Sequence, residues 1–301
     1  MQKTCASYLS CKEEKKVLFE KKGFPILQCK QCGHQFIEIT DHADHLSTVY
    51  SDDYFFEGKD GYPNYLNKKN ILYKQGLRYA KLIAKYIKPG KVLDIGSAAG
   101  FILKGFEDSG WICHGVEPNE TMAAYGREKL NLDIKTGSIE TLETHERFDL
   151  INMIQVIGHV YDLDKTLQNV TALLKDDGLV LVESWDVESI TARLMGKNWH
   201  EYCPPSVVHW FSDKTLSALF KFYGFELVAK GHPIKKINAE HAFSFLEGRN
   251  FQLIFKKSLI DAINRFGGKV TLTYPLRDVK WYVFRKISHG SLFTGAERAK
   301  E

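Results

Sequence analysis

The sequence predicts an α/β fold, with a mostly parallel sheet covered by helices on both faces. Three observations predict it. From Lys91 to Trp185, short apolar runs alternate with amphipathic stretches of helical length. The runs are apolar at consecutive positions, as expected of strands that are buried on both sides. The segments between most of them are long enough to hold a helix, which parallel neighbours require.

The expected elements follow one another in a regular order. A helix over residues 70–88 carries Leu72, Leu77 and Leu82 at helical spacing and ends at a Pro-Gly turn. In the main domain, strands are expected at residues 91–96, 111–118, 132–137, 147–154 and 178–185, and helices at 100–110, 119–130 and 163–174. A helix over 213–223, which Ser212 or Asp213 can cap and Gly224 ends, precedes a strand over 225–232.

The chain is expected to divide into four parts. These are a cysteine-bearing module over 1–45, a linker and covering helix over 46–88, the main domain over 89–235, and residues 236–301. The last part is predicted to hold a helical insertion and then two strands that complete the sheet. In the insertion Phe251, Phe255, Leu259 and Ile263 recur at helical spacing and favour packing on the sheet edge or a partner subunit over contact with lipid.

The composition is that of a globular protein with no membrane span, since 44% of residues are hydrophobic and 26% charged, without a long apolar run. The amino terminus lacks the apolar core of a secretory signal, so a cytoplasmic location is expected, with the six cysteines as thiols or metal ligands. The 41 basic and 37 acidic residues are spread along the chain, which disfavours a dedicated nucleic-acid binder. Peripheral membrane contact is not favoured, and the oligomeric state is left open.

The first predicted strand runs into a loop of small residues, Gly96-Ser97-Ala98-Ala99-Gly100, that opens a helix. Small residues let a ligand approach the backbone, and the start of a helix offers N–H groups and a positive dipole end. The dinucleotide pattern G-x-G-x-x-G is absent, because no glycine stands two positions after Gly96. Hydride transfer is therefore the less favoured function for this loop.

Asp94-x-Gly96-x-x-x-Gly100 resembles the first motif of the Rossmann-like S-adenosylmethionine-dependent methyltransferases. An acid at this strand end suits the cationic amino-acid part of that cofactor and would repel a pyrophosphate. The next strand ends in Glu117-Pro118, where the family places an acid that accepts the ribose hydroxyls. The alternatives are a helix cap for Asp94 and a solvated surface charge for Glu117.

The resemblance continues along the domain and covers about residues 70–232. Gly137-Ser138-Ile139-Glu140 corresponds to the adenine-holding segment, with Ser138 where an acid is commoner, so that backbone and Ile139 packing are expected to hold adenine. Residues 148–160 resemble the segment that lines the cofactor and ends in a histidine. The expected cofactor contacts are Asp94, Gly96, Ser97, Ala98, Gly100, Phe101, Glu117, Pro118, Ser138, Ile139 and Gln155.

The amino-terminal cysteines predict a structural zinc site. Cys29-x-x-Cys32-Gly33 has the spacing of a zinc knuckle, and Cys5 and Cys11 are the expected partner ligands, with His34 as the alternative fourth ligand. A degenerate ribbon without metal is the competing interpretation. A small zinc ribbon before such a domain resembles a bacterial group that includes sugar methyltransferases, in which the ribbon helps to shape or cover the acceptor site.

Methyl transfer requires alignment of the acceptor and, where the nucleophile starts protonated, a base. Residues 199–211 resemble the family's acceptor segment beyond the fifth strand. His209 is the preferred general base, His159 is the alternative, and Tyr202 is expected to position the acceptor with its hydroxyl. A purely structural role for either histidine is the competing interpretation.

The sequence thus predicts a methyltransferase for a small molecule, with a sugar or nucleotide-linked sugar favoured for O- or C-methylation. A quinone or lipid, an RNA or a protein are the alternative acceptors. A module that binds the cofactor without turnover is the alternative from a different class.

Overall fold

The structure, a computed structural model, describes residues 14–39, 49–56, 64–234, 236–238, 271–273 and 277–287. The chain forms two compact units, one of residues 1–231 with 278–301 and one of residues 232–277. The candidate site lies in the first unit.

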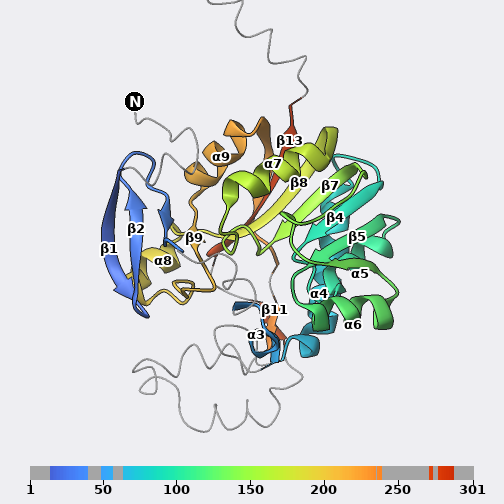
Figure 1. Cartoon of the computed structure of the whole chain (residues 1–301), viewed down its shortest axis with the longest axis horizontal. Coiled ribbons are helices and arrows are strands. Elements are labelled where there is room, and N and C mark those ends of the chain that lie inside the picture. The colour runs from blue at the N-terminus through green and yellow to red at the C-terminus, as the bar shows by residue number, and fades with distance from the viewer. Residues whose placement is uncertain are drawn as a thin grey trace, which may run out of the picture. The chain divides into compact units, whose positions relative to one another are not determined.

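The first unit is built on a seven-stranded sheet with the strand order β10-β13-β8-β7-β4-β5-β6 (Figure 1). Its strands are β4 (Lys91–Ile95), β5 (Ile112–Glu117), β6 (Asp133–Thr136), β7 (Phe148–Ile154), β8 (Leu174–Trp185), β10 (Phe225–Gly231) and β13 (Val279–Lys286). Neighbours from β8 to β6 pair in parallel, and β13 is antiparallel to both β8 and β10. The mostly parallel α/β fold is therefore confirmed.

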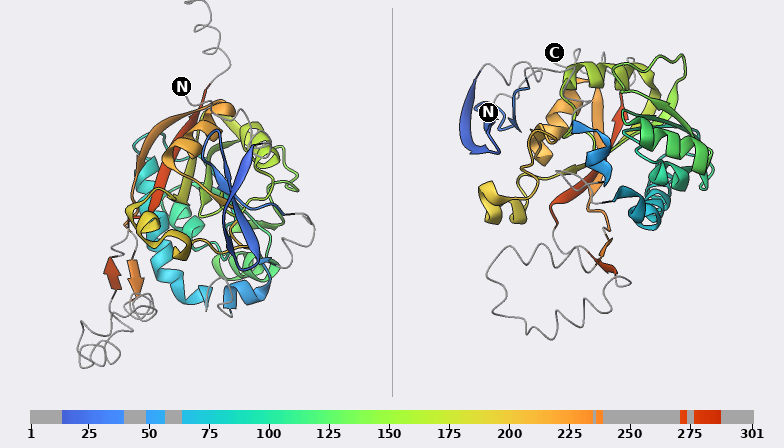
Figure 2. Two further views of the ribbon diagram at one scale, coloured as in Figure 1. Left: turned by 90° about the vertical axis from the view of Figure 1, so that its left-hand side faces the viewer. Right: turned by 60° about the horizontal axis from the view of Figure 1, so that its bottom comes forward.

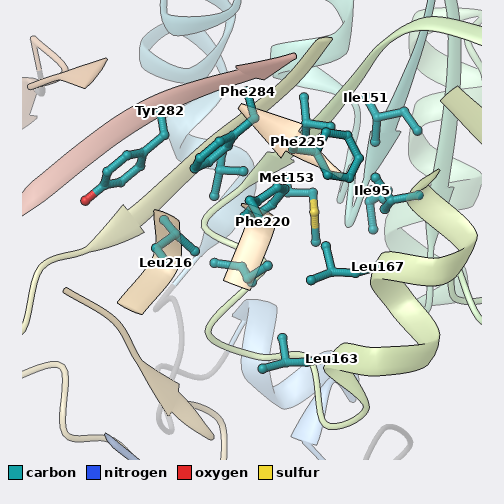
Figure 3. Packing of buried hydrophobic residues seen from close by; sticks show 14 of the residues in the cluster. Ile95, Ile151, Met153, Leu163, Leu167, Leu216, Phe220, Phe225, Tyr282 and Phe284 are labelled. Carbon is teal, nitrogen blue, oxygen red and sulfur yellow. The ribbon is translucent and has the colours of Figure 1, made fainter. Parts of the chain in front are cut away.

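Helices cover both faces because alternate side chains of each strand point to opposite sides. Val92, Leu150 and Leu181 pack with one group of helices, α4 (Lys69–Ile83), α5 (Phe101–Glu107) and α6 (Glu120–Leu130). Their chain neighbours Leu93, Ile151 and Val180 pack on the other face with α7 (Leu163–Leu173) and α9 (Asp213–Phe222). Figure 3 shows this second cluster, in which Phe220 of α9 stacks on Phe284 of β13 with ring centroids 4.1 Å apart.

Helix α4 lies directly against α5 because two glycines leave room for it. A Cβ on Gly76 would collide with the carbonyl oxygen of Ile102, and one on Gly105 would come within 2.6 Å of the Leu77 nitrogen. The covering helix expected over residues 70–88 is thus packed on the main domain. It ends at Ile83, earlier than the sequence pattern predicted.

The amino-terminal segment forms a separate antiparallel sheet of four strands in the order β1-β2-β3-β9. Its own strands are β1 (Lys15–Lys21), β2 (Phe24–Cys29) and β3 (Gln35–Phe36), whereas β9 (His209–Trp210) comes from the connection between β8 and α9. That connection also holds α8 (Ile190–Met195) and the short helix η2 (Gly196–Asn198). Figures 1 and 2 show β1 and β2 beside this connection. The amino-terminal module is therefore joined to the main domain by a shared strand.

Residues before α4 contribute two short helices, α3 (Asp52–Phe56) and η1 (Tyr65–Lys68). Phe55 and Tyr65 pack with Phe101, the first residue of α5, in a small apolar cluster. This segment therefore lies beside the loop that joins β4 to α5.

The prediction that two late strands complete the main sheet is wrong for the first of them. In the second unit β12 (Thr271–Thr273) pairs with β11 (Lys236–Asn238), and only β13 enters the seven-stranded sheet. The predicted helical stripe from Phe251 to Ile263 lies outside the described residues. Within the described ranges, no helix has the length and apolar character that a bilayer crossing requires.

Candidate functional site

The loop between β4 and α5 has left-handed backbone at three of its small residues. Gly96, Ala98 and Gly100 have φ angles of 67°, 46° and 78°, in the left-handed region. A Cβ on Gly96 would come within 2.7 Å of Val156, and one on Gly100 within 2.6 Å of Leu132. Glycine is needed at both positions for the backbone to make this turn.

Glu117, at the carboxyl end of β5, holds this loop through its side chain. Its Oε2 accepts the Ala98 N–H at 2.8 Å, and its Oε1 accepts the Asn119 N–H at 2.9 Å. The residue is only 3% exposed, and burial raises the pKa of its carboxyl to about 7. The alternative of a solvated surface charge at Glu117 does not fit this position.

Asp94, at the end of the neighbouring strand β4, is also 3% exposed. Burial, followed by the charge of Glu117, raises the pKa of its carboxyl to about 8, and no donor from the described residues offsets the shift. The Ser97 hydroxyl beside it is buried without a hydrogen-bond partner among the described residues. Two buried acids and an unsatisfied hydroxyl at the ends of adjacent strands favour a cationic ligand with donor groups.

Asn119, two residues after Glu117, binds residues that precede α4. Its side-chain oxygen caps α6 by accepting the Met122 N–H at 2.8 Å, and its Nδ2 donates at 3.0 Å to the Tyr50 carbonyl and to Asp52 Oδ1. Tyr50 in turn donates its hydroxyl to the Ser206 carbonyl at 3.3 Å. Tyr50 therefore lies between the acids at the strand ends and the loop that follows β8.

The remaining predicted cofactor contacts lie around the same strand ends but in different settings. Phe101 and Ile139 are buried, Pro118 and Ser138 are half-buried, and Phe101 stacks against Tyr65. The Gln155 side chain instead donates to the Glu183 carboxylate at 2.7 Å. Its expected contact with the cofactor stays a prediction.

The two loops that carry the predicted catalytic histidines meet in the structure. The N–H groups of Val208 and His209 both donate to the Gly158 carbonyl, at 2.8 and 3.0 Å. His159 Nδ1 lies 2.6 Å from the Ser206 carbonyl oxygen. A carbonyl oxygen can only accept, so Nδ1 carries the proton and Nε2 is the basic nitrogen of His159.

His209 occupies a different environment, inside the core that joins the two sheets. It is 2% exposed, its Nδ1 lies 3.2 Å from His34 Nε2, and its ring packs beside Phe211. Burial lowers the pKa of His34 to about 3, so His34 is neutral at physiological pH. The geometry therefore favours a structural role for His209 as the link between β9 and the amino-terminal module.

Tyr202 also faces the amino-terminal module. Its hydroxyl donates to Gln35 Oε1 at 2.6 Å, and its ring packs against Phe19, Trp199 and Trp210. These contacts attach β3 to the connection after β8. The expected role of Tyr202 in positioning an acceptor stays a prediction, and the hydrogen bond to Gln35 speaks against it.

The predicted zinc site is described only in part. The turn after β2 is closed by hydrogen bonds from Gly33 N–H to the Cys29 carbonyl and from Cys29 N–H to the His34 carbonyl. Within the described residues, no group of three or more potential ligands could hold a metal ion. Cys5 and Cys11 lie outside those residues, so zinc stays a prediction.

Comparisons with known proteins agree with this geometry. The family model described as a methyltransferase domain matches residues 71–230, which is more than half of the chain. The chain belongs to the methyltransferase domain family. A ubiquinone biosynthesis O-methyltransferase of Bradyrhizobium diazoefficiens is 27% identical to this methyltransferase over 117 residues, covering 37% of the chain and 42% of the relative. A relative of the same description from Rhodopseudomonas palustris is 28% identical over the same shares. The chain thus spans less than half of the length of these relatives.

Solved structures show the same fold as this methyltransferase. An S-adenosylmethionine-dependent methyltransferase of Thermotoga maritima matches 81% of the chain and all of its own chain, with a TM-score of 0.51 and 21% identity. The 1,6-didemethyltoxoflavin-N1-methyltransferase of Burkholderia thailandensis, solved with its substrate and S-adenosylhomocysteine, matches 91% of the chain and all of its own, with a TM-score of 0.54 and 14% identity. At these identities the likeness extends to the fold alone.

Sequence reasoning missed Asn119, Tyr50 and Glu183, which organise the surroundings of the site. The capping role of Asn119 has a local signal, because asparagine before the apolar residues of a helix favours an N-cap. The contacts of Tyr50 and Glu183 join segments that are far apart in the chain, so no local sequence pattern predicts them.

Proposed function

We propose that this protein is an S-adenosylmethionine-dependent methyltransferase that acts on a small molecule. The observation that carries the proposal is the pair of buried acids, Asp94 and Glu117, at adjacent strand ends beside a loop of small residues. In this proposal Glu117 accepts the ribose hydroxyls, Asp94 faces the cationic amino-acid moiety, and Ile139 packs on adenine. The bound cofactor supplies an electrophilic methyl group on a sulfonium.

We further propose His159 as the general base, in preference to His209. The Ser206 carbonyl fixes the tautomer of His159 and leaves Nε2 as the nitrogen that takes a proton from the acceptor. His159 is half-buried, and the ring of Tyr50 lies beside it with centroids 6.1 Å apart. Tyr50 would thus line the acceptor side of the pocket with an aromatic surface.

The acceptor class that we favour is a phenolic hydroxyl, such as that of a quinone precursor. The relatives are named as ubiquinone biosynthesis O-methyltransferases, and an aromatic wall at Tyr50 and Tyr54 suits a planar ring. A sugar or nucleotide-linked sugar is the second candidate, since it rests on the resemblance of the amino-terminal module. A phenol loses its proton more readily than a sugar hydroxyl does, so the two acceptors differ in how much they need His159.

The test incubates the purified chain with methyl-labelled S-adenosylmethionine and two acceptor panels, one of catechols and related phenols and one of nucleotide sugars. We expect a mass gain of one methyl group in the phenol panel, and none with a Glu117→Gln variant used as the control. A gain confined to the sugars would select the second acceptor. Cofactor binding without transfer to either panel, or to an added RNA and protein mixture, would favour a non-catalytic binding module.

The zinc site is a separate prediction, with Cys29 and Cys32 joined by Cys5 and Cys11. Metal analysis of protein purified without added zinc should give about one equivalent, because closed thiolate sites bind zinc tightly. Cys32→Ser should release it, whereas Cys203→Ser, outside the predicted ligand set, should keep it. If Cys5→Ser keeps the metal and His34→Ala releases it, the ligand set is wrong.

A further inference from the structure

A buried carboxylate under helix α4, which binds the Gln155 side chain, has no role assigned to it so far. Glu183, near the end of β8, is 0% exposed. Its Oε1 accepts from Gln155 Nε2 at 2.7 Å, and its Oε2 accepts from Gln75 Nε2 at 3.0 Å and from the Tyr79 hydroxyl. The side chain therefore connects two positions on α4 with the residue that follows β7.

All three hydrogen-bond partners of Glu183 are neutral donors. Removing a carboxylate from water is costly, and hydrogen bonds from neutral donors offset only part of that cost. Burial, together with the charge of Glu183, raises the pKa of Tyr79 well above its usual range, so Tyr79 remains a donor. An apolar residue could hold α4 on the sheet at lower cost, which points to a use for the polar contacts themselves.

The position of Glu183 continues the polar row that begins at Asp94. Asp94 is paired with Asn152 across β4 and β7, and Ile154 is paired with Glu183 across β7 and β8. Because side chains alternate, Asp94, Asn152 and Glu183 all lie on the face that α4 and α5 cover. Asn152 is 0% exposed, and its amide has no partner among the described residues. The row thus leads from the proposed cofactor pocket to the start of the His159 loop.

Gln155 is the first residue of the loop that carries His159, and two hydrogen bonds to Glu183 hold it in place. Its φ angle is 58°, a left-handed conformation that is unfavourable for a residue with a side chain. Its N–H donates to the Glu183 carbonyl at 2.9 Å, and its Nε2 donates to the Glu183 carboxylate. Because a carboxylate only accepts hydrogen bonds, it fixes which end of the Gln155 amide faces β8.

We infer that Glu183 is a positioning residue. It fixes the orientation of the Gln155 amide, and with it the path of the loop that carries His159 relative to the bound cofactor. This inference rests on the proposed function. Its charge is the feature that matters, because a neutral amide at position 183 lets Gln155 turn its own amide over and still form a hydrogen bond. The Gln155 side chain at the start of the loop then has a different orientation, although the fold is kept.

The test compares three single variants and one double variant in the methyl-transfer assay, with the acceptor that wild-type protein uses. Glu183→Gln should lower kcat by about 10- to 100-fold, the scale expected of a small misalignment of reacting groups, while cofactor affinity and thermal stability change little. In a Gln155→Met background, which has no amide for Glu183 to orient, adding Glu183→Gln should lower kcat little further. Asp149→Asn is the matched control, since it removes a carboxylate near the other end of β7, where Asp149 accepts from Lys91 N–H and Lys175.

Two results would overturn the inference. One is an unchanged kcat in Glu183→Gln, and the other is a loss of kcat, cofactor affinity and stability in parallel, as a purely structural carboxylate would produce. If wild-type protein methylates no acceptor, the proposed function fails, and amide hydrogen exchange then decides the positioning role by itself. Exchange over residues 155–160 should rise in Glu183→Gln, and unchanged exchange in that variant would refute the positioning role.

Discussion

His159→Ala should turn over its acceptor about 10² to 10⁴ times more slowly than wild-type protein, which is the usual contribution of a positioned proton transfer. The affinity for S-adenosylmethionine should hardly change, because His159 lies on the loop after β7 and is not one of the acids that would hold the cofactor. The defect should shrink as the pH approaches the pKa of the acceptor hydroxyl, which then loses its proton to solvent. Steady-state kinetics across pH, together with calorimetry, measures both parts.

His209→Ala serves as the comparison for that experiment. Its ring is buried against His34 and Phe211, so its loss should lower thermal stability and weaken cofactor binding and turnover together. A full rate in His159→Ala, with a selective loss of kcat in a stable His209→Ala protein, would transfer the role of base to His209. A full rate in both variants would mean that alignment alone suffices.

Asp94→Asn should weaken S-adenosylmethionine binding by about 1 to 3 kcal/mol, the range for loss of a charged hydrogen bond, or roughly 5- to 150-fold in Kd. In the wild-type protein, affinity should rise between about pH 6 and pH 9, because the cationic cofactor binds the ionised form of carboxyls whose pKa values are raised to about 8 and about 7. Calorimetry in buffers of different ionisation enthalpy should detect protons released on binding.

Two controls define this second prediction. S-adenosylhomocysteine keeps the ammonium group that Asp94 is proposed to face, so its affinity should depend on pH in a similar way. Asp94→Asn should also flatten the dependence of stability on pH. A raised carboxyl pKa means that the native state binds more protons than the unfolded state between about pH 4 and pH 8, so wild-type stability should fall as the pH rises through that window. Cofactor binding that is equally tight in Asp94→Asn and independent of pH would contradict the assignment.

The sequence was sufficient for the features that depend on local pattern. Continuous apolar runs such as Leu179 to Val182 identified strands buried on both faces, and the small residues from Gly96 to Gly100 identified the loop that opens a helix. The family model matches residues 71–230, which is close to the span of about residues 70–232 that the motif resemblance covers.

The sequence was insufficient where a contact joins distant segments. Strand β9 has two residues and no recognisable pattern of its own, and it exists because β3 offers it a partner. Pairing with β3 places His209 beside His34, a position that the sequence around His209 does not predict. The polar row that ends at Glu183 has the same origin, since its members Asp94, Asn152 and Glu183 come from three strands. Which histidine faces an acceptor is therefore a question of tertiary packing.

The place of β13 in the sheet also constrains how the protein comes to be folded. Among the described strands, β10 pairs only with β13, and β13 follows it after the whole of residues 232–277. During synthesis, β10 therefore emerges from the ribosome before its partner exists, while β4, β5, β6, β7 and β8 can already pair with one another. The step that closes the sheet joins segments distant in the chain, and such steps are slow because the loop entropy must be overcome first. Until then the outer edge of β8 is exposed, which makes the nascent chain most prone to aggregation shortly before its synthesis reaches β13.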